Sequence, residues 1–174
     1  TPMHSRWSDA EAQSTIDRYA KVCPADVALR VYTSRLIGAD PSLVLHGGGN
    51  TSVKTRLADD TGREVDVLCV KGSGWDLIDL EPQGLPALRL ASLLELRARP
   101  SLSDEDMVNA QRTRMLHASA PNPSVETLLH AFLPHKFIDH SHADAILALV
   151  DQPDSERLCR ELFGERFGIV PYIM

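Results

Sequence analysis

The stretch from Asn122 to His142 constrains the fold most strongly, because prolines mark both sides of its central part. Ser124 follows Pro123 and precedes apolar residues at helical spacing, which predicts a helix with Ser124 as its N-cap. Pro134 would end that helix. The residues from Phe137 to His142 then predict a short strand, in which side chains alternate between two faces.

Glu126 is the candidate acid/base of this stretch. It would lie in the first turn of the helix, where the positive end of the helix dipole favours a carboxylate. His130 follows one helical turn later and would share its face. An ordinary capped helix with an acidic first turn accounts for the same residues, so this pattern alone leaves both interpretations open.

His140 and His142 are the candidate metal ligands. Residues two apart in a strand point to the same side, so both imidazoles could reach one divalent cation, and imidazole suits zinc and its neighbours. A catalytic zinc normally has about three protein ligands and an open position. The third ligand is not obvious, since His130 and His135 have simple structural interpretations at the helix and its exit.

Two glycine-rich loops could hold an anion. Gly47 to Gly49 run into Asn50, Thr51 and Ser52, and a predicted strand at residues 65–70 ends in Lys71-Gly72-Ser73-Gly74. Glycines let backbone amides approach a ligand, and the polar side chains add donors. The first loop could equally be a flexible hairpin, and it matches neither the Walker loop nor the dinucleotide-binding fingerprint.

Composition excludes several classes of function. The chain has 174 residues, enough for one domain, and a net charge of −6 without a basic run, which argues against nucleic acid as a partner. Its apolar runs are too short to span a bilayer. The three cysteines are odd in number and lack metal or redox spacing, so we expect reduced thiols and a cytoplasmic protein.

The remaining segments alternate between helix and strand, which predicts an α/β layered domain. We expect further helices at residues 11–19, 25–37, 86–99, 103–117, 143–150 and 155–163. We expect further strands at residues 43–46, 53–55 and 168–173. The chain begins without a methionine and ends in a strand-like run, so we expect residues 1–174 to form a single domain truncated at its C-terminus.

In order and spacing, four motifs together resemble the class II aldolase/adducin family: Gly49-Asn50-Thr51-Ser52, Lys71-Gly72-Ser73-Gly74, Pro123-Ser124-Val125-Glu126 and His140-Ser141-His142. The similarity covers most of the chain, from about residue 43 to residue 150. The first two regions look most like the aldolase part of bifunctional rhamnulose-phosphate aldolase/alcohol dehydrogenases, in which a short-chain dehydrogenase domain follows.

This resemblance implies a three-layer α/β/α fold around a central mixed, largely antiparallel sheet. It also implies a homo-oligomer, a tetramer in the family, and a divalent metal, usually zinc, held by three histidines. Two of these map onto His140 and His142, and the third lies downstream of this chain in the family. Glu126 falls on the position of the catalytic acid/base.

The resemblance further implies a sugar-phosphate substrate, because Asn50, Ser73, Gly74 and Ser124 fall on phosphate-binding positions. Many members have a second serine where this chain has Val125, which removes one hydroxyl from that pocket. The implied activity is cleavage of a ketose 1-phosphate such as rhamnulose 1-phosphate. An epimerase or dehydratase of the same fold, or an adducin-like binding module without catalysis, is the alternative. The histidine pair and Glu126 argue against the last of these.

Overall fold

An antiparallel four-stranded sheet forms the centre of the computed structural model, which describes residues 4–171. Its order is β3-β2-β1-β4, so β1 is paired on both sides. The strands are β1 (Asn50–Ala58), β2 (Glu64–Val70), β3 (Ala87–Arg89) and β4 (Phe137–His140). Because β1 and β4 are distant in sequence but neighbours in the sheet, residues that are far apart in the chain meet there.

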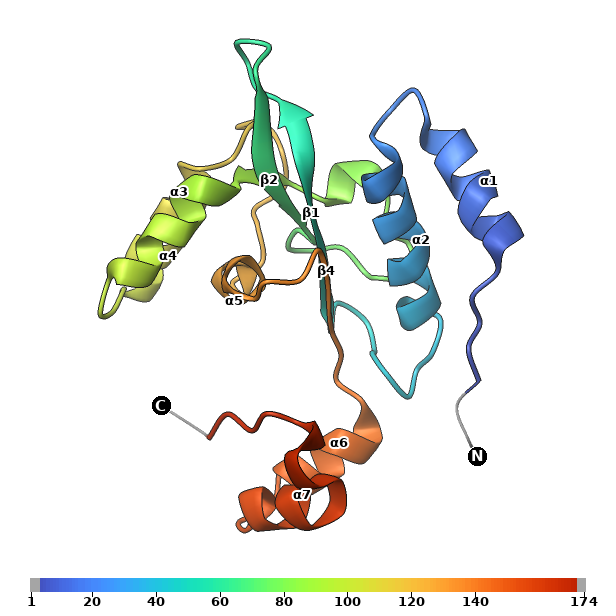
Figure 1. Ribbon diagram of the computed structural model, residues 1–174, viewed down its shortest axis with the longest axis vertical. Helices are drawn as coiled ribbons and strands as arrows, with labels where there is room; N and C mark the ends of the chain where they lie inside the picture. The colour runs from blue at the N-terminus through green and yellow to red at the C-terminus, as the bar shows by residue number, and fades with distance from the viewer. Residues whose placement is uncertain (1–3, 172–174) are drawn as a thin grey trace.

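Helices cover both faces of this sheet (Figure 1). On one side lie α1 (Asp9–Tyr19) and α2 (Ala25–Gly38). On the other lie α3 (Leu90–Leu94), α4 (Asp104–Arg112) and α5 (Thr127–Phe132). The expected α/β class and its helix–sheet–helix layering are confirmed. The sheet is not mixed, since every strand pair in the described part of the chain is antiparallel.

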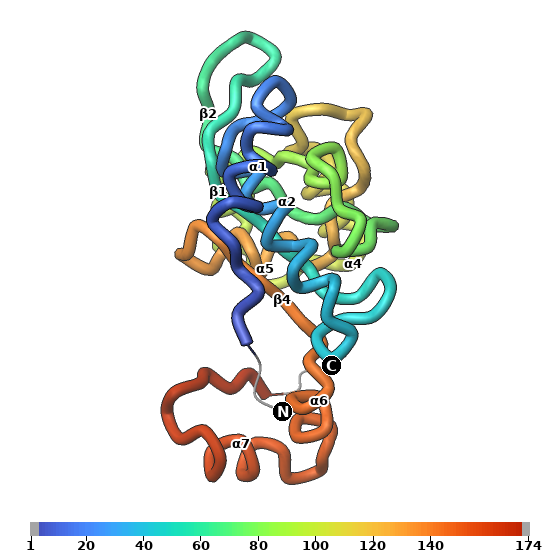
Figure 2. The backbone as a smooth tube through the Cα atoms, turned by 90° about the vertical axis from the view of Figure 1, so that its right-hand side faces the viewer, coloured from blue at the N-terminus to red at the C-terminus, as the bar shows by residue number. Residues whose placement is uncertain are grey.

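The last two helices, α6 (Asp144–Val150) and α7 (Ser155–Phe163), pack on each other. Figures 1 and 2 both show them beyond the end of β4, apart from the three layers. Short 3-10 turns at Pro82–Gly84, Glu95–Ala98 and Gly164–Arg166 complete the regular structure. No helix in residues 4–171 combines the length and the apolar character needed to cross a membrane.

The side chains of β2 alternate between the two faces of the sheet, and this divides the core into two clusters. Val67 and Cys69 pack with α2 residues in one cluster, and Leu68 and Val70 pack with residues of α3 and α5 in the other. All four are at most 1% exposed. A strand that is apolar on both faces can be buried only between two layers of helices.

Residues 43–46 are not the expected strand. The turn after Asp40 extends only into the start of this segment, where the amides of Leu43 and Val44 both donate to the Asp40 carbonyl. The segment ends at His46, which has a positive φ of 49°, and at the glycine loop. The strand that follows is longer than expected, and its partners are β2 and β4 rather than a hairpin with residues 43–46.

The helices that form within residues 86–99 and 103–117 are also shorter than predicted. The reason is the same for both, because part of each segment pairs with the sheet or with its edge strand. Ala87–Arg89 pairs with β2 as an edge strand, so α3 begins only at Leu90. The outer edge of β3 is met by the segment after α4, where the amide of Leu116 donates to the Ala87 carbonyl. Edge-strand backbone groups need such partners, and apolar periodicity does not reveal them. Ser103 caps α4, since its Oγ accepts from the Asp106 amide.

Boundaries near the candidate site differ as well. Helix α5 begins at Thr127, and Ser124 is not its N-cap, because the Ser124 hydroxyl accepts from the amide of Glu126 in a turn that precedes the helix. Strand β4 ends at His140, so His142 lies in the following loop. Of the strand expected at residues 168–173, the first four residues have no regular structure, and residues 172 and 173 lie outside the described part.

Candidate active site

Gly49 brings the first glycine loop against β4. Its φ is +72°, and an added Cβ atom would lie 2.5 Å from Val44 Cγ1 and 2.9 Å from the His140 carbonyl oxygen. Only glycine fits such a left-handed, crowded position without strain. The close approach allows Asn50, the next residue, to begin β1 directly opposite His140.

Glu126 joins this cross-strand pair. Its Oε2 atom accepts a hydrogen bond of 3.0 Å from Asn50 Nδ2, and its Oε1 atom lies 3.1 Å from His140 Nδ1. Asn50 is 1% exposed, whereas the side chains of Glu126 and His140 are about one-third exposed, at 33% and 31%. The Glu126 carboxylate thus contacts residues of two neighbouring strands, β1 and β4. It is also accessible to solvent, as a group that exchanges protons with a substrate must be.

The pKa values of Glu126, which precedes α5, and of His130, inside α5, shift for different reasons. Burial favours the neutral form of Glu126, but the Asn50 hydrogen bond and the neighbouring histidines outweigh it, so its pKa is below its ordinary value. Burial lowers the pKa of His130 to about 4. At neutral pH the carboxylate of Glu126 is therefore ionised and the imidazole of His130 is uncharged.

His130 has the structural role that its sequence context suggested. It is fully buried, and its Nδ1 atom lies 2.8 Å from Ser52 Oγ on β1. Four residues of helix and two residues of strand both advance the chain by about 6 Å. Consequently Glu126 contacts Asn50, and His130 contacts Ser52. The second pair lies one helical turn after the first pair. From the sequence, Ser52 is only a polar residue after the first glycine loop, and its pairing with His130 becomes visible only in the fold.

His140 and His142 are neighbours, with ring centroids 4.9 Å apart and ring planes inclined at 60°. His142 is exposed in its loop, whose backbone is held by the bond from the His142 amide to the Leu43 carbonyl. The Nδ1 atom of His140 is buried, and although it lies 3.1 Å from Glu126 Oε1, the two atoms are not aligned for a hydrogen bond. Such an orphaned nitrogen beside a second imidazole and a carboxylate is compatible with metal ligation.

The described residues supply only part of a metal site. No group of three or more His, Cys, Asp and Glu side chains within residues 4–171 is arranged to hold a metal ion. The donor chemistry of the histidine pair fits zinc, and the coordination shell needs a further ligand from elsewhere.

The predicted phosphate-binding residues fall into two groups. Ser124 is in direct contact with Glu126, the predicted acid/base, since its hydroxyl lies 3.4 Å from Glu126 Oε2. Ser73 and Gly74 belong to the second glycine loop, which runs beside the segment that precedes Ser124: the Ser73 amide donates to the Asn122 carbonyl over 2.8 Å. Ser73 and Gly74 are exposed, and Gly74 has a φ of +85°.

Lys71, at the start of that loop, is buried although it lies at the end of a strand. It is 5% exposed, and its ammonium donates to the carbonyls of Gly47 and Trp75. Val125 is 63% exposed.

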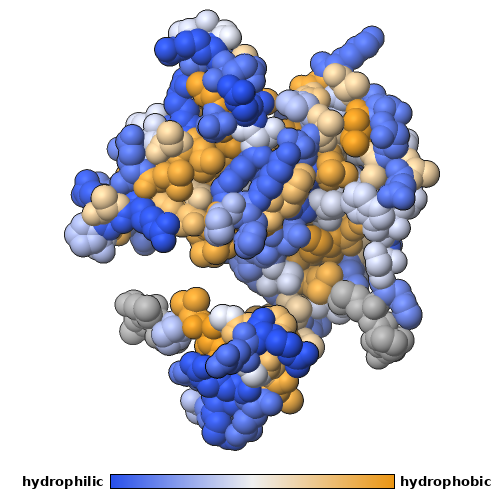
Figure 3. All heavy atoms as spheres, viewed as in Figure 1, coloured by the Kyte–Doolittle hydropathy of each residue, from blue (hydrophilic) through white to orange (hydrophobic). Residues whose placement is uncertain are grey.

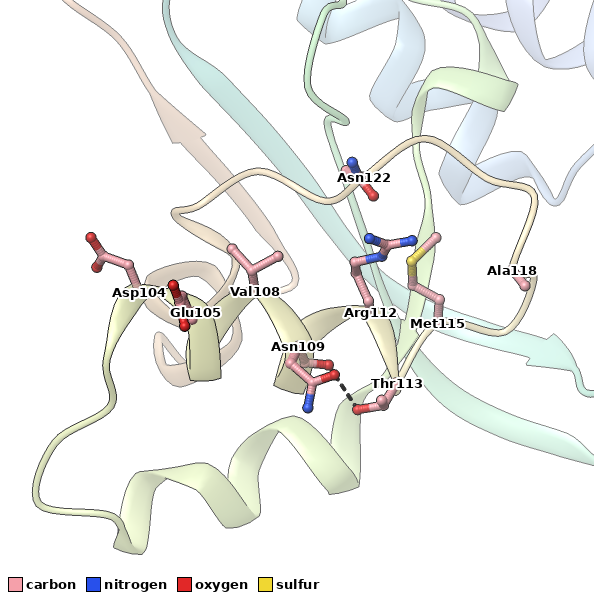
Figure 4. Close-up of a pocket in the computed structure, with 9 residues that line it drawn as sticks. All are labelled: Asp104, Glu105, Val108, Asn109, Arg112, Thr113, Met115, Ala118 and Asn122. Carbon is pink, nitrogen blue, oxygen red and sulfur yellow. Dashed lines mark hydrogen bonds between the residues drawn. The ribbon is translucent and has the colours of Figure 1, made fainter.

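Two cavities lie elsewhere on the domain. A cavity of about 680 Å³ separates α4 from the segment between Met115 and Asn122 (Figure 4). An apolar cavity of about 550 Å³ adjoins Cys23, Cys69 and His117. Neither has Asn50, Glu126 or His140 in its lining. The candidate site is thus defined by contacts among polar side chains rather than by either of these two cavities.

Comparisons with known proteins agree with this arrangement. The model of the "Class II Aldolase and Adducin N-terminal domain" family matches residues 30–174, so the chain belongs to that family. The solved N-terminal class II aldolase domain of a conserved protein from Thermoplasma acidophilum superposes with a TM-score of 0.80 and 41% identity, over 94% of this chain and 71% of that one.

A curated relative is the "Uncharacterized oxidoreductase YuxG" of Bacillus subtilis (strain 168). It is 42% identical over 150 residues, which make up 86% of this chain and 22% of that protein. The chain thus spans about a fifth of that relative's length.

Proposed function

We propose that this chain is a metal-dependent aldolase domain that cleaves a ketose or deoxyketose 1-phosphate, such as rhamnulose 1-phosphate, into dihydroxyacetone phosphate and an aldehyde. The observation that carries the proposal is the Glu126 carboxylate, which contacts both Asn50 and His140 beside the second imidazole of His142. A proton-transfer group next to candidate metal ligands is what this reaction requires.

His140 and His142 would hold the metal, for which zinc is the natural candidate. The third histidine that the family resemblance implies would come from polypeptide outside residues 4–171. When bound, a divalent cation polarises substrate oxygens and stabilises negative charge that develops on them. Glu126 is the nearest additional donor when no substrate is present.

Glu126 would handle the proton. In retro-aldol cleavage the bond between carbons 3 and 4 breaks, and its electron pair remains on the dihydroxyacetone phosphate fragment as an enediolate. The Glu126 carboxylate would take the proton of the hydroxyl on carbon 4, which becomes the aldehyde, and would then return that proton to carbon 3. Asn50 keeps the carboxylate oriented, since its amide donates to one oxygen and leaves the other facing His140.

The two glycine loops would hold the phosphate through Asn50, Ser73, Gly74 and Ser124. Backbone amides and hydroxyls of this kind are suitable phosphate donors. With Val125 in place of serine, the pocket has one hydroxyl fewer than many relatives. We therefore expect weaker phosphate recognition unless another group compensates.

The oxidoreductase name of the Bacillus relative is compatible with this proposal. Most of that protein lies outside the aligned region, so a dehydrogenase domain beside an aldolase domain would account for the name. An epimerase or dehydratase on the same scaffold is the alternative, and the products of a substrate panel distinguish the three reactions.

We further propose that the protein is a cytoplasmic homo-oligomer. Large apolar side chains are exposed along α3 and α5, among them Leu94, Leu129 and Leu133. Figure 3 shows apolar side chains gathered on this side of the domain. Light scattering during gel filtration tests the assembly, and a monomer at micromolar concentration would contradict it.

Metal uptake tests the proposed centre. Purified chain should bind zinc, His142→Ala should bind it at least about tenfold more weakly, and exposed His135→Ala should be unaffected. Equal zinc affinity in all three proteins would remove the site. Release of dihydroxyacetone phosphate from rhamnulose 1-phosphate, measured with the longest protein that contains this chain, then tests the reaction.

A further inference from the structure

The apolar cavity of about 550 Å³ reaches from the surface into the core of the domain. Its wall includes Val27 of α2, Cys69 of β2 and Leu85, which are at most 5% exposed and belong to the core cluster on the α2 side of the sheet. The exposed side chains of Gln83 and His117 also line it. The cavity therefore has an apolar interior and a polar opening, and its volume is usual for a small-molecule site.

The wall of this cavity contains no permanently charged side chain. Asp, Glu, Lys and Arg make up 24% of the sequence, yet none of them lines the cavity in the described part of the chain. By contrast, Asp104, Glu105 and Arg112 line the other cavity (Figure 4). An ion in the uncharged cavity would lose water without gaining an opposite charge. The cavity therefore favours an uncharged ligand.

The two thiols of the wall do not change this conclusion. Burial raises the pKa of the Cys23 thiol, and burial, with a smaller contribution from Cys23, raises the pKa of the Cys69 thiol to about 12. Both thiols are thus uncharged at neutral pH. A half-buried, uncharged Cys23 in the wall is also a natural reporter of whether the cavity is filled.

Prolines keep the cavity in shape. Four of them, from separate segments, line it: Pro24, Pro82, Pro86 and Pro121. The proline ring fixes φ near −65°, so these segments have few other conformations in which they could collapse into the cavity. Binding to a site that is already formed costs little ordering of the protein. The cavity is therefore prepared for a ligand rather than dependent on one for its shape.

We propose that this cavity is a second ligand site, which binds an uncharged and mainly apolar small molecule with one hydrogen-bonding group. The apolar part contacts Val27, Cys69 and Leu85, and the hydrogen-bonding group remains at the opening near Gln83 and His117. A small molecule fits better than a flat protein surface, which would cover the opening without reaching the core residues. This site is independent of the proposed aldolase activity, because none of the residues assigned to that activity lines the cavity.

A fluorescence titration with 1-aminoanthracene, an uncharged aromatic amine that emits more strongly in apolar surroundings, tests the proposal. We expect saturable binding to the complete chain. Anthracene-2-carboxylate has the same ring system and a negative charge, so it should bind at least about tenfold more weakly. Failure of 1-aminoanthracene to bind, or equal affinity for the carboxylate, would overturn the proposal.

Two variants locate the bound dye. Ala120 lines this cavity, so Ala120→Trp should fill part of it and lower the affinity for 1-aminoanthracene by about tenfold or more. Ala118→Trp is the matched control, because the same substitution two residues earlier enters the wall of the other cavity. It should change the affinity by less than about twofold. Equal affinities of the two folded variants would show that the dye binds elsewhere.

Alkylation of Cys23 by iodoacetamide, followed by mass spectrometry, gives a second measurement on the unmodified chain. With 1-aminoanthracene at about ten times its dissociation constant, the reaction of Cys23 should slow about tenfold, because only the unoccupied cavity exposes the thiol. The reaction of Cys159, which lies in α7 outside the cavity, should keep its rate. An unchanged Cys23 rate at saturating dye would overturn the proposal even if Ala120→Trp failed to fold.

Discussion

Asn50 and Glu126 are 76 positions apart in the chain, yet the Asn50 amide donates a 3.0 Å hydrogen bond to the Glu126 carboxylate. The contact exists because β1 and β4 are neighbours and because α5 lies over that part of the sheet. It unites the residue after the first glycine loop with the residue that precedes α5. The geometry of the candidate site is therefore a consequence of strand pairing between distant parts of the chain.

The Ser52–His130 pair should hold α5 in register with β1. Ser52→Ala would leave His130 Nδ1 buried without its partner and should lower the free energy of unfolding by about 1–3 kcal/mol. Urea unfolding measures the loss. Ser119→Ala, at an exposed loop position, is the control and should be neutral to within about 0.5 kcal/mol. A Ser52→Ala protein as stable as the control would mean that this hydrogen bond does not anchor the helix.

Gly49 should be more sensitive to substitution than a glycine of similar conformation elsewhere. Gly49 and Gly62 have φ values of +72° and +80°, but an added Cβ would meet Val44 and His140 at Gly49 and nothing within 4 Å at Gly62. Gly62→Ala should therefore cost only the left-handed strain, about 1–2 kcal/mol. Gly49→Ala should cost clearly more. Equal losses in thermal or urea unfolding would show that the loop can move away from β4.

Asp59 should stabilise the fold at neutral pH and lose this contribution as the solution becomes acidic. The Thr61 hydroxyl, the amides of Thr61 and Arg63 and the Arg89 guanidinium hold the pKa of its carboxyl well below the usual range, against the opposing effect of burial. A carboxyl with a depressed folded-state pKa stabilises the fold above its unfolded pKa of about 3.9 and loses this contribution as the pH falls below it. Asp59→Asn should therefore flatten the decline in unfolding free energy between about pH 5 and pH 2.

Asp60→Asn is the matched control for that experiment, because Asp60 adjoins Asp59 but has a side chain that is 76% exposed. Its acid profile should follow that of wild type. An Asp59→Asn profile that also follows wild type would indicate that other carboxyls dominate the acid transition.

Local sequence signals predicted the elements whose ends are marked by specific residues. Pro24 precedes α2 and Gly38 is its last residue, which agrees with the helix expected at residues 25–37, and Ser103 caps α4. The segment at Ala87–Arg89 could not be predicted in the same way, because its apolar spacing suits a helix and only the free edge of β2 makes it a strand. Long-range pairing, which a single sequence does not display, decides such cases.

In the candidate site too, some features could be predicted from the sequence and others could not. Glu126, His140 and Asn50 were named from motif order, and the structure brings these three into contact. Their catalytic and metal-binding roles stay predictions. The burial of Lys71 and the pairing of Ser52 with His130 could not be predicted, because both depend on which face of a strand meets which loop or helix.

The most direct test of the proposed function is the turnover of Glu126→Gln. The substitution keeps the size of the side chain and removes its ability to transfer a proton. In the longest protein that contains this chain, the account predicts that release of dihydroxyacetone phosphate from a ketose 1-phosphate falls by about two to four orders of magnitude. Zinc and phosphate binding should persist. Near-normal cleavage by Glu126→Gln would contradict the account, because Glu126 would then be only a residue at the start of α5.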